Sequence, residues 1–198
     1  AGLVCWNYFQ DCITKCSDTF NANQQIFGKV YFPRLVVPFS IVISNLIKLG
    51  IQFLLFFIVY LYYAFTLGGF NVNWTICLLP LLIILLACIG LGFGLVISSM
   101  TTKYRDLRFL VSFGVQLWMY ATPVIYPLSV MKENYPDKIW VIVANPLTAI
   151  TETFKYGFTG VGVFEWSYLL YSIVFAVVVL LLGIMVFNRV QKNFMDVI

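Results

Sequence analysis

The sequence predicts an all-α integral membrane protein, built as a polytopic bundle of helices. Of its 198 residues, 62% are hydrophobic and only 10% are charged, which is far from the balance of a soluble globular domain. Segments 74–100 and 167–187 contain no charged residue. Each exceeds the roughly 20 residues that a helix needs to cross the hydrocarbon core of a bilayer, so both are predicted to span the membrane.

Segment 35–66 predicts a third span, which is longer than the other two. It is interrupted only by Pro38, Lys48 and Gly50, so we expect it to cross with tilt or a kink. Lys48 is the one ionisable group deep in an apolar span, and such groups mark functional sites. Its counterpart is an anionic substrate or a partner carboxylate, or else the lysine extends its stem toward the cytoplasmic face.

The N-terminal third precedes these spans. Residues 1–20 predict the inner end of a descending helix, in which Asp11 and Lys15 lie one turn apart and can pair. The chain opens on an apolar run too short to span by itself, so we expect truncation inside a span. Residues 21–34 are polar and then aromatic, and Pro33 bars continuation of a helix. They predict a short helix along the membrane surface.

Basic residues gather in the connections at one set of helix ends, which the positive-inside rule places in the cytoplasm. The opposite connections are 67–74, which is uncharged, and 131–140, in which the charges balance. Loop 101–108 and the tail 188–198 are therefore predicted to be cytoplasmic. The basic residues concerned are Lys29, Arg34, Lys103, Arg105, Arg108, Arg189 and Lys192.

Segment 109–122 is uncharged and is followed by Pro123 and Pro127, where a helix is expected to break. We expect this segment to enter the membrane and then bend. The following region, 123–164, is apolar but broken by several prolines and glycines. It predicts a re-entrant pair of short helices on the outer side, at the mouth of a conduit, because non-helical backbone at membrane depth must be covered. The alternative is an external loop with an amphipathic helix lying on the surface.

The second of these short helices has clear boundaries. Asn145 is a suitable N-cap and Pro146 suits the first helical position. The helix would run for about three turns, too few to cross a membrane, and end at Gly157 or Gly160. Within it, a glutamate and a lysine at i and i+3 can pair: Glu152 and Lys155.

Gly90 and Gly94 form a G-x-x-x-G motif in the span 74–100. The motif is typical of close helix–helix or subunit contact. The alternative interpretation is ordinary packing of small residues within one bundle.

The chain offers little chemistry for catalysis. It has no histidine, its five cysteines follow neither a metal-ligand nor a disulfide pattern, and no acidic residue lies centrally in a predicted span. A phosphate loop of the G-x-x-x-x-G-K-[ST] type is also absent from the sequence. We therefore predict no catalytic residue, no metal site and no ATP-binding site in this chain, which argues against a membrane transferase.

Aromatic side chains make up 18% of the chain and crowd the predicted outer third. Their faces suit stacking on sugar rings along a glycan path, or they form the aromatic belt of a membrane interface. The residues are Trp118, Tyr120, Tyr126, Trp140 and Tyr156.

Three motifs, "KVYFPR", "YRDLR" and "TPVIYPLS", occur in that order. With them, essentially the whole chain resembles the permease subunit of ABC-2 exporters for polysaccharides and polyol phosphates, which carry O-antigen, capsule or teichoic-acid chains. In that family an amphipathic interface helix and a first span precede the matched region, and both are missing here. The resemblance implies an ABC-2 exporter bundle with a cytoplasmic coupling helix and external re-entrant helices.

The resemblance also implies partners and a location. Two copies of an ABC ATPase subunit would bind ATP and Mg²⁺, so this chain would need no cofactor of its own. A second permease copy would complete a homodimer, and a lipid-linked glycan would enter from the inner leaflet. The chain would be a multi-pass protein of the bacterial cytoplasmic (inner) membrane, in contact with membrane lipid and not with nucleic acid, with its C-terminus in the cytoplasm.

Two sets of site residues follow from the resemblance. Segment 21–34 would be the coupling helix, and Asp106 would hold an arginine in place, although plain positive-inside anchoring also accounts for the basic loop. Contact with the ATPase subunit is assigned to Asn23, Phe27, Lys29, Tyr31, Phe32, Arg34, Tyr104, Arg105, Asp106 and Arg108. The substrate path or gate is assigned to Lys48, Trp118, Tyr120, Pro123, Tyr126, Pro127 and Tyr156.

Two other functions compete with polysaccharide export. One is an ABC-2 exporter of small hydrophobic compounds, against which the aromatic outer third favours a glycan. The other is a passive channel or scaffold, which leaves residues 21–34 unexplained.

Overall fold

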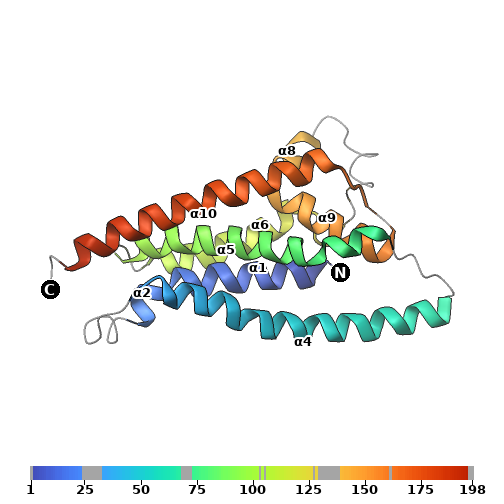
Figure 1. Ribbon diagram of the computed structural model, residues 1–198, viewed down its shortest axis with the longest axis horizontal. Helices are drawn as coiled ribbons and strands as arrows, with labels where there is room; N and C mark the ends of the chain where they lie inside the picture. Colours follow the sequence, from blue (N-terminus) through green and yellow to red (C-terminus); the bar gives the residue numbers. More distant parts are fainter. Residues whose placement is uncertain are drawn as a thin grey trace.

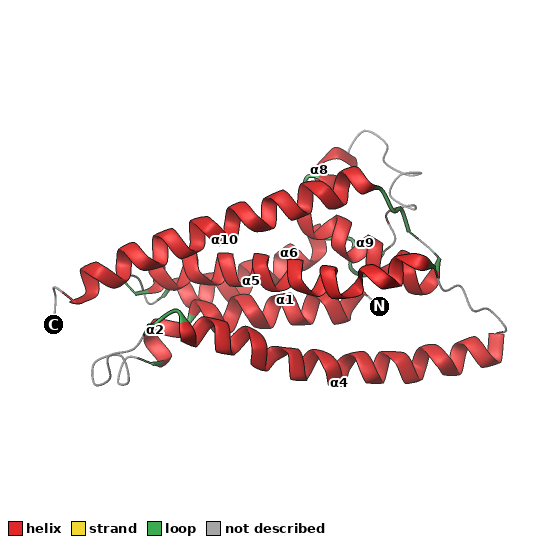
Figure 2. Cartoon of the chain, viewed as in Figure 1, coloured by secondary structure: helices red, strands yellow, loops and turns green. Residues whose placement is uncertain are grey.

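Long helices running side by side make up the computed structural model, which describes residues 2–23, 33–67, 73–102, 104, 106–126, 128, 139–160 and 162–195. All regular structure within these residues is helical (Figures 1 and 2), which confirms the predicted all-α class. The elements are α1 (Gly2–Ser17), α2 (Thr19–Ala22), α4 (Val36–Leu67), the 3₁₀ helix η1 (Trp74–Leu78), α5 (Leu79–Thr101), α6 (Leu107–Ala121), α8 (Ile139–Val143), α9 (Pro146–Thr159) and α10 (Trp166–Met195).

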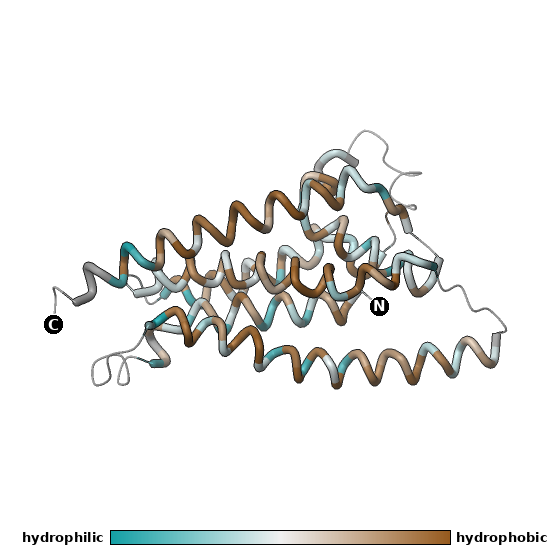
Figure 3. The backbone as a smooth tube through the Cα atoms, viewed as in Figure 1, coloured by the Kyte–Doolittle hydropathy of each residue, from teal (hydrophilic) through white to brown (hydrophobic). Residues whose placement is uncertain are grey.

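Within the described residues, three helical stretches are long and apolar enough to cross a membrane: Val36–Thr66, Trp74–Thr101 and Trp166–Gln191. They coincide with the three spans expected from the sequence, and Figure 3 shows their largely apolar course. Pro38 lies in the first turn of α4, where its missing N–H removes no intrahelical bond.

Helix α5 is the centre of the bundle and packs on α1 and α10. On its α1 side, a Cβ added at Gly90 would lie 2.8 Å from Cys12 Cβ, and Gly94 meets Cys16 in the same way. On the other side, Gly92 faces Gly183 of α10: a Cβ at Gly183 would lie 2.5 Å from the Gly92 carbonyl oxygen. The structure therefore supports small-residue packing within one bundle for the G-x-x-x-G motif.

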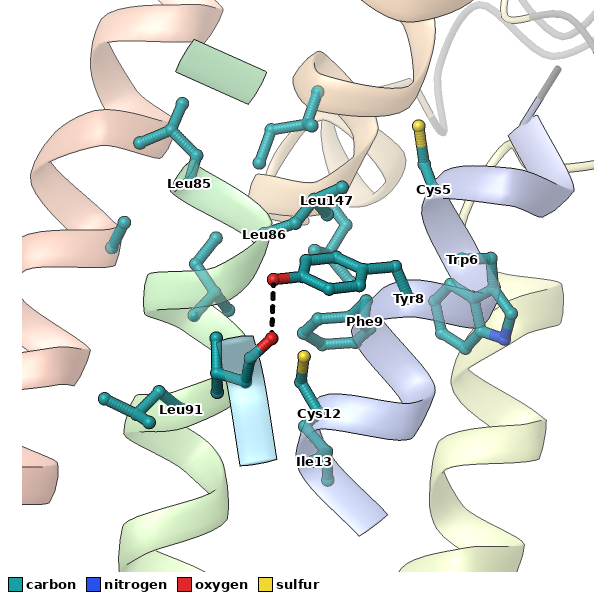
Figure 4. Close-up of a cluster of buried hydrophobic side chains, with 14 of the residues drawn as sticks. Cys5, Trp6, Tyr8, Phe9, Cys12, Ile13, Leu85, Leu86, Leu91 and Leu147 are labelled. Atoms are coloured by element: carbon teal, nitrogen blue, oxygen red, sulfur yellow. Dashed lines mark hydrogen bonds between the residues drawn. The ribbon is translucent and has the colours of Figure 1, made fainter. Parts of the chain in front are cut away.

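The core lies between α1, α5 and α9 (Figure 4). Trp6 and Phe9 of α1 are fully buried, as are Leu86 of α5 and Leu147 of α9. The hydroxyl of Tyr8 donates to the Val42 carbonyl over 3.5 Å and links this core to α4. A buried aromatic side chain removes about 150–250 Å² of its surface from water, so Trp6 and Phe9 contribute a large part of the stability of this core.

Two lysines also take part in polar contacts between α1 and α4. Lys48 Nζ lies 2.5 Å from Asp11 Oδ2, and Lys15 Nζ donates to the buried Asn45 Oδ1 over 2.7 Å. The expected pairing of Asp11 with Lys15 is therefore wrong, because α4 runs alongside α1 and gives each of them a partner. Asp11 also supplies the counter-charge of Lys48, whose side chain remains 53% exposed.

Helix α6 lies close to the expected boundaries 109–122, whereas α10 is longer than expected. Helix α6 has 15 residues, about 22 Å at the usual rise, and is shorter than the roughly 30 Å hydrocarbon core. Helix α10 does not end at 187 but continues to Met195, so the first part of the predicted tail is helical. The end of α10 lies at the same end of the bundle as α2, opposite α8 and α9 (Figure 1).

Candidate functional site

Helix α6 ends in a bend at its C-terminal end. Thr122 has extended backbone, and both its N–H and its hydroxyl donate to the Trp118 carbonyl, over 3.1 and 3.0 Å. Pro123, which follows, is buried and cannot donate. Val124 N then donates to the Thr122 carbonyl over 2.7 Å. The predicted break at Pro123 is confirmed, whereas Pro127 lies outside the described residues.

Helix α9 begins as the sequence predicts. Asn145 Oδ1 accepts a bond from Leu147 N over 3.1 Å, Pro146 occupies the first turn, and Gly160 ends the helix with a φ of 67°. The Asn145 amide also donates from Nδ2 to Thr122 Oγ1 over 2.8 Å. One side chain thus caps α9 and holds the end of α6.

We expect Asn145→Ala to lower the free energy of unfolding by about 1–2 kcal/mol, because it removes the helix cap and the bond to Thr122. Thermal unfolding of the purified protein measures the loss. Asn145→Ser is the matched control, since serine caps a helix but is too short to reach Thr122, and it should recover most of the cap's contribution. Equal losses for the two variants would contradict a capping role.

Glu152 and Lys155 of α9 form the predicted i,i+3 pair, with Nζ 3.1 Å from Oε1. Their side chains are 1% and 11% exposed. Lys155 Nζ also donates to the carbonyls of Pro123 and of Tyr126, the latter over 2.9 Å. Glu152 Oε2 accepts from Leu128 N over 3.3 Å. The pair therefore joins α9 to the backbone of the bend.

Tyr126 makes a hydrogen bond that links the bend back to α6. Its hydroxyl donates to the Tyr120 carbonyl over 3.2 Å.

Helix α9 lies inside the bundle. Most of its residues are buried, and it contacts α10, α1, α5 and η1. Ser172 Oγ donates to the Pro146 carbonyl over 2.7 Å, and Asn73 Nδ2 donates to the Tyr156 carbonyl over 3.0 Å. An amphipathic helix on a membrane surface would keep one face exposed, so this burial speaks against that alternative.

The remaining residues of the predicted substrate path are scattered. Trp118 packs edge-on against Phe9 and Phe93 in the interior. Tyr156 is half-buried and stacks beside Phe164, while Tyr120 is 69% exposed. Lys48 lies on α4, paired with Asp11. Of the described residues of this set, Pro123, Tyr120 and Tyr126 therefore lie together around the bend.

The predicted ATPase contacts are only partly described. Tyr104 and Asp106 are exposed, and Arg34 is buried. Asn23 Nδ2 donates to the Thr19 carbonyl over 3.0 Å. Arg108 pairs with Asp18 of the same chain over 3.1 Å. The others, Phe27, Lys29, Tyr31, Phe32 and Arg105, lie outside the described residues, as does most of the predicted helix 21–34.

A cavity of about 590 Å³ lies beside the Arg108–Asp18 pair, between α1, α4 and α6. Its walls include Lys15 and Ser112 as well as the two paired residues. It is mainly apolar over the rest of its lining, which includes Ile41, Phe109 and Val111.

The resemblance assigns gating to the bend at Pro123–Pro127 with the helix 146–158, but sequence reasoning does not single out the Glu152–Lys155 pair of that helix for this role. The available signal was a lysine and a glutamate in a short helix that follows two helix-breaking prolines. Asp11 and Asp18, the intrachain partners of Lys48 and Arg108, were also missed. Asp11 lies within α1 and Asp18 directly follows it, and no local pattern links either acid to a base more than 30 positions away.

Comparison with known proteins shows the family to which the chain is similar. A family model described as ABC-2 type transporter matches residues 1–159. The chain is 28% identical over 200 residues to an O-antigen export system permease protein RfbA of Klebsiella pneumoniae, covering 100% of this chain and 73% of that protein. It is 25% identical over 154 residues to the protein of the same name from Myxococcus xanthus, covering 78% of this chain and 57% of that one.

Proposed function

Because the chain belongs to the ABC-2 type transporter family, we propose that it is the permease subunit of an ATP-driven exporter of a lipid-linked polysaccharide of the O-antigen kind. The observation that carries the proposal is similarity along the entire chain to two Klebsiella pneumoniae permeases named for O-antigen export. The family consists of membrane transport subunits, so the chain itself is not expected to catalyse a reaction.

The proposal includes partners that hydrolyse ATP with Mg²⁺: two ATPase subunits on the cytoplasmic side of a permease homodimer. The docking surface would be segment 21–34 with loop 101–108. Support comes from the exposure of Tyr104 and Asp106, which lie in the turn before α6. The Arg108–Asp18 pair fixes the start of α6 to the end of α1, so a push on this turn would be transmitted to α6.

The proposed location is the cytoplasmic membrane, with the C-terminus inside. Support comes from the three apolar helices and from the exposed Arg108 and Arg189, which lie toward the end of the bundle that holds α2 and the end of α10. The glycan would enter from the inner leaflet and leave past the bend of α6. There the non-helical backbone is covered by α9, as membrane depth requires.

Co-purification with the ATPase encoded beside it tests the docking part. The full-length wild-type chain should retain the ATPase and stimulate ATP hydrolysis in lipid, and Arg105→Glu with Tyr31→Ala should lose the complex while staying folded. Trp140→Ala, an exposed residue at the opposite end of the bundle, is the control and should bind normally. Unchanged binding of the double variant would overturn docking through these residues.

Export itself is tested by restoring surface polysaccharide in cells that lack their own permease. Appearance of polymer at the surface, dependent on the ATPase, supports the proposal. Efflux of a hydrophobic dye without surface polymer would instead favour an exporter of small hydrophobic compounds and overturn it.

A further inference from the structure

Resting on the proposed export function, we propose that Glu152 and Lys155 are positioning residues of the outer gate. Their ion pair fastens the bend after α6 to α9, so that bend and helix move as one body. The two residues do not bind the glycan. They set where the bend lies when the path is closed, and they carry it along when α9 moves.

The ammonium of Lys155 is fully occupied. It has three hydrogens to donate, and the structure gives it three acceptors: the Pro123 carbonyl, the Tyr126 carbonyl and Glu152 Oε1. No N–H remains for a substrate phosphate or sugar. The acceptors lie on both sides of the bend, so the lysine spans it.

The carboxylate of Glu152 makes a further hydrogen bond to the backbone after the bend. Its Oε2 accepts from the backbone N–H of Leu128, just beyond the bend. Gly162, with a φ of 142°, passes so close that an added Cβ would lie 3.1 Å from the same oxygen. Glu152 therefore lies between the bend and the segment that leads into α10.

An ion pair suits this place because the bend leaves backbone carbonyls without helical donors. In apolar surroundings each such carbonyl requires a donor, and a neutral side chain supplies fewer donors than an ammonium. The ammonium of Lys155 donates to two of these carbonyls, and the carboxylate of Glu152 neutralises its charge. Glu165 and Tyr168 line a small cavity next to Glu152, and they are the further titratable groups that face it.

A role confined to stability would predict a different pattern from a positioning role. If the pair only stabilises the fold, any folded variant should export normally. If the pair positions the gate, a folded neutral variant should lose export while the ATPase keeps working, since conformational steps of this kind govern turnover.

The experiment uses the full-length permease in complex with its ATPase, in lipid. The test variant is Glu152→Gln with Lys155→Met, which leaves no unpaired charge. We expect its polysaccharide export to fall about tenfold or more, with ATP hydrolysis within about twofold of wild type. In hydrogen exchange, the amides of Val124 and Leu128 should exchange about tenfold faster or more. Lys155→Arg, which keeps charge and donors, should preserve both properties.

The control for exchange is Asp11→Asn with Lys48→Met. It removes an ion pair elsewhere in the chain and should leave exchange at the bend unchanged. Normal export by the folded test variant would overturn the positioning role, and unchanged exchange would overturn the fastening. If the test variant does not fold, Lys155→Arg decides: a folded protein with wild-type exchange but lost export contradicts the proposal. If the wild-type complex exports no polysaccharide, the proposed function fails, while the exchange result still tests the fastening.

Discussion

Lys155→Met alone is expected to lower the free energy of unfolding by about 3–5 kcal/mol, because it leaves a buried carboxylate without its counter-ion. Glu152 is 1% exposed, so water cannot replace the lysine. The carbonyls of Pro123 and Tyr126 lose their donor in the same step. Thermal or denaturant unfolding of the detergent-solubilised protein measures the effect.

The control for this prediction is the double variant with Glu152→Gln. Removing both charges should destabilise the protein less than Lys155→Met alone, because no unpaired buried charge remains, and a double-mutant cycle should give a coupling of about 1–3 kcal/mol between the two positions. Equal destabilisation by the single and the double variant would mean that the carboxylate is not charged and paired as the structure indicates.

Gly183→Ala is expected to destabilise the protein by about 1–3 kcal/mol through overpacking. The new Cβ would lie 2.5 Å from the Gly92 carbonyl oxygen and 3.0 Å from its Cα. Both are backbone atoms of α5, so no side chain can turn away to make room, and the two helices must separate. The loss is measured as a lower midpoint of thermal unfolding.

Gly50→Ala is the matched control for that substitution. Gly50 lies within α4 and an added Cβ meets nothing within 4 Å. Alanine is the better helix former, so stability should be unchanged or rise by up to about 1 kcal/mol. If both alanines destabilise the protein equally, the contact between Gly183 and Gly92 does not limit the packing of α5 on α10.

Much of the fold could be predicted because its signals are local. The three spans follow from uncharged length, and the start of α9 follows from the cap Asn145 and the proline after it. The sequence predicts too short an α10, because Arg189 and Lys192 indicate the beginning of a tail. A helix that leaves the membrane can continue in water, and charge alone does not mark its end.

Contacts between helices could not be predicted in the same way. Asp11 and Lys15 have ideal spacing for a pair, yet each finds a partner on α4. Which residues of α4 face α1 depends on how the two helices pack, and no local pattern specifies this.

At the candidate gate, the spacing of Glu152 and Lys155 was readable but their contacts with the bend were not. Two of the three acceptors of Lys155 are backbone carbonyls, 32 and 29 positions away in the chain. Every residue has a carbonyl, so such an acceptor leaves no signature in the sequence. The predicted docking helix 21–34 stays a prediction, since most of it lies outside the described residues.

The glycines of α5 also bear on how the protein can move. With Gly90 and Gly94 on one side and Gly92 on the other, α1, α5 and α10 meet at backbone distance. Packed interfaces of this kind shift between discrete arrangements and do not deform gradually. Helix α6 is different: of its residues, all of them described, Val115 alone is buried. We therefore expect the three glycine-packed helices to move together as one rigid unit during a transport cycle, and α6 to reorient relative to them at Pro123.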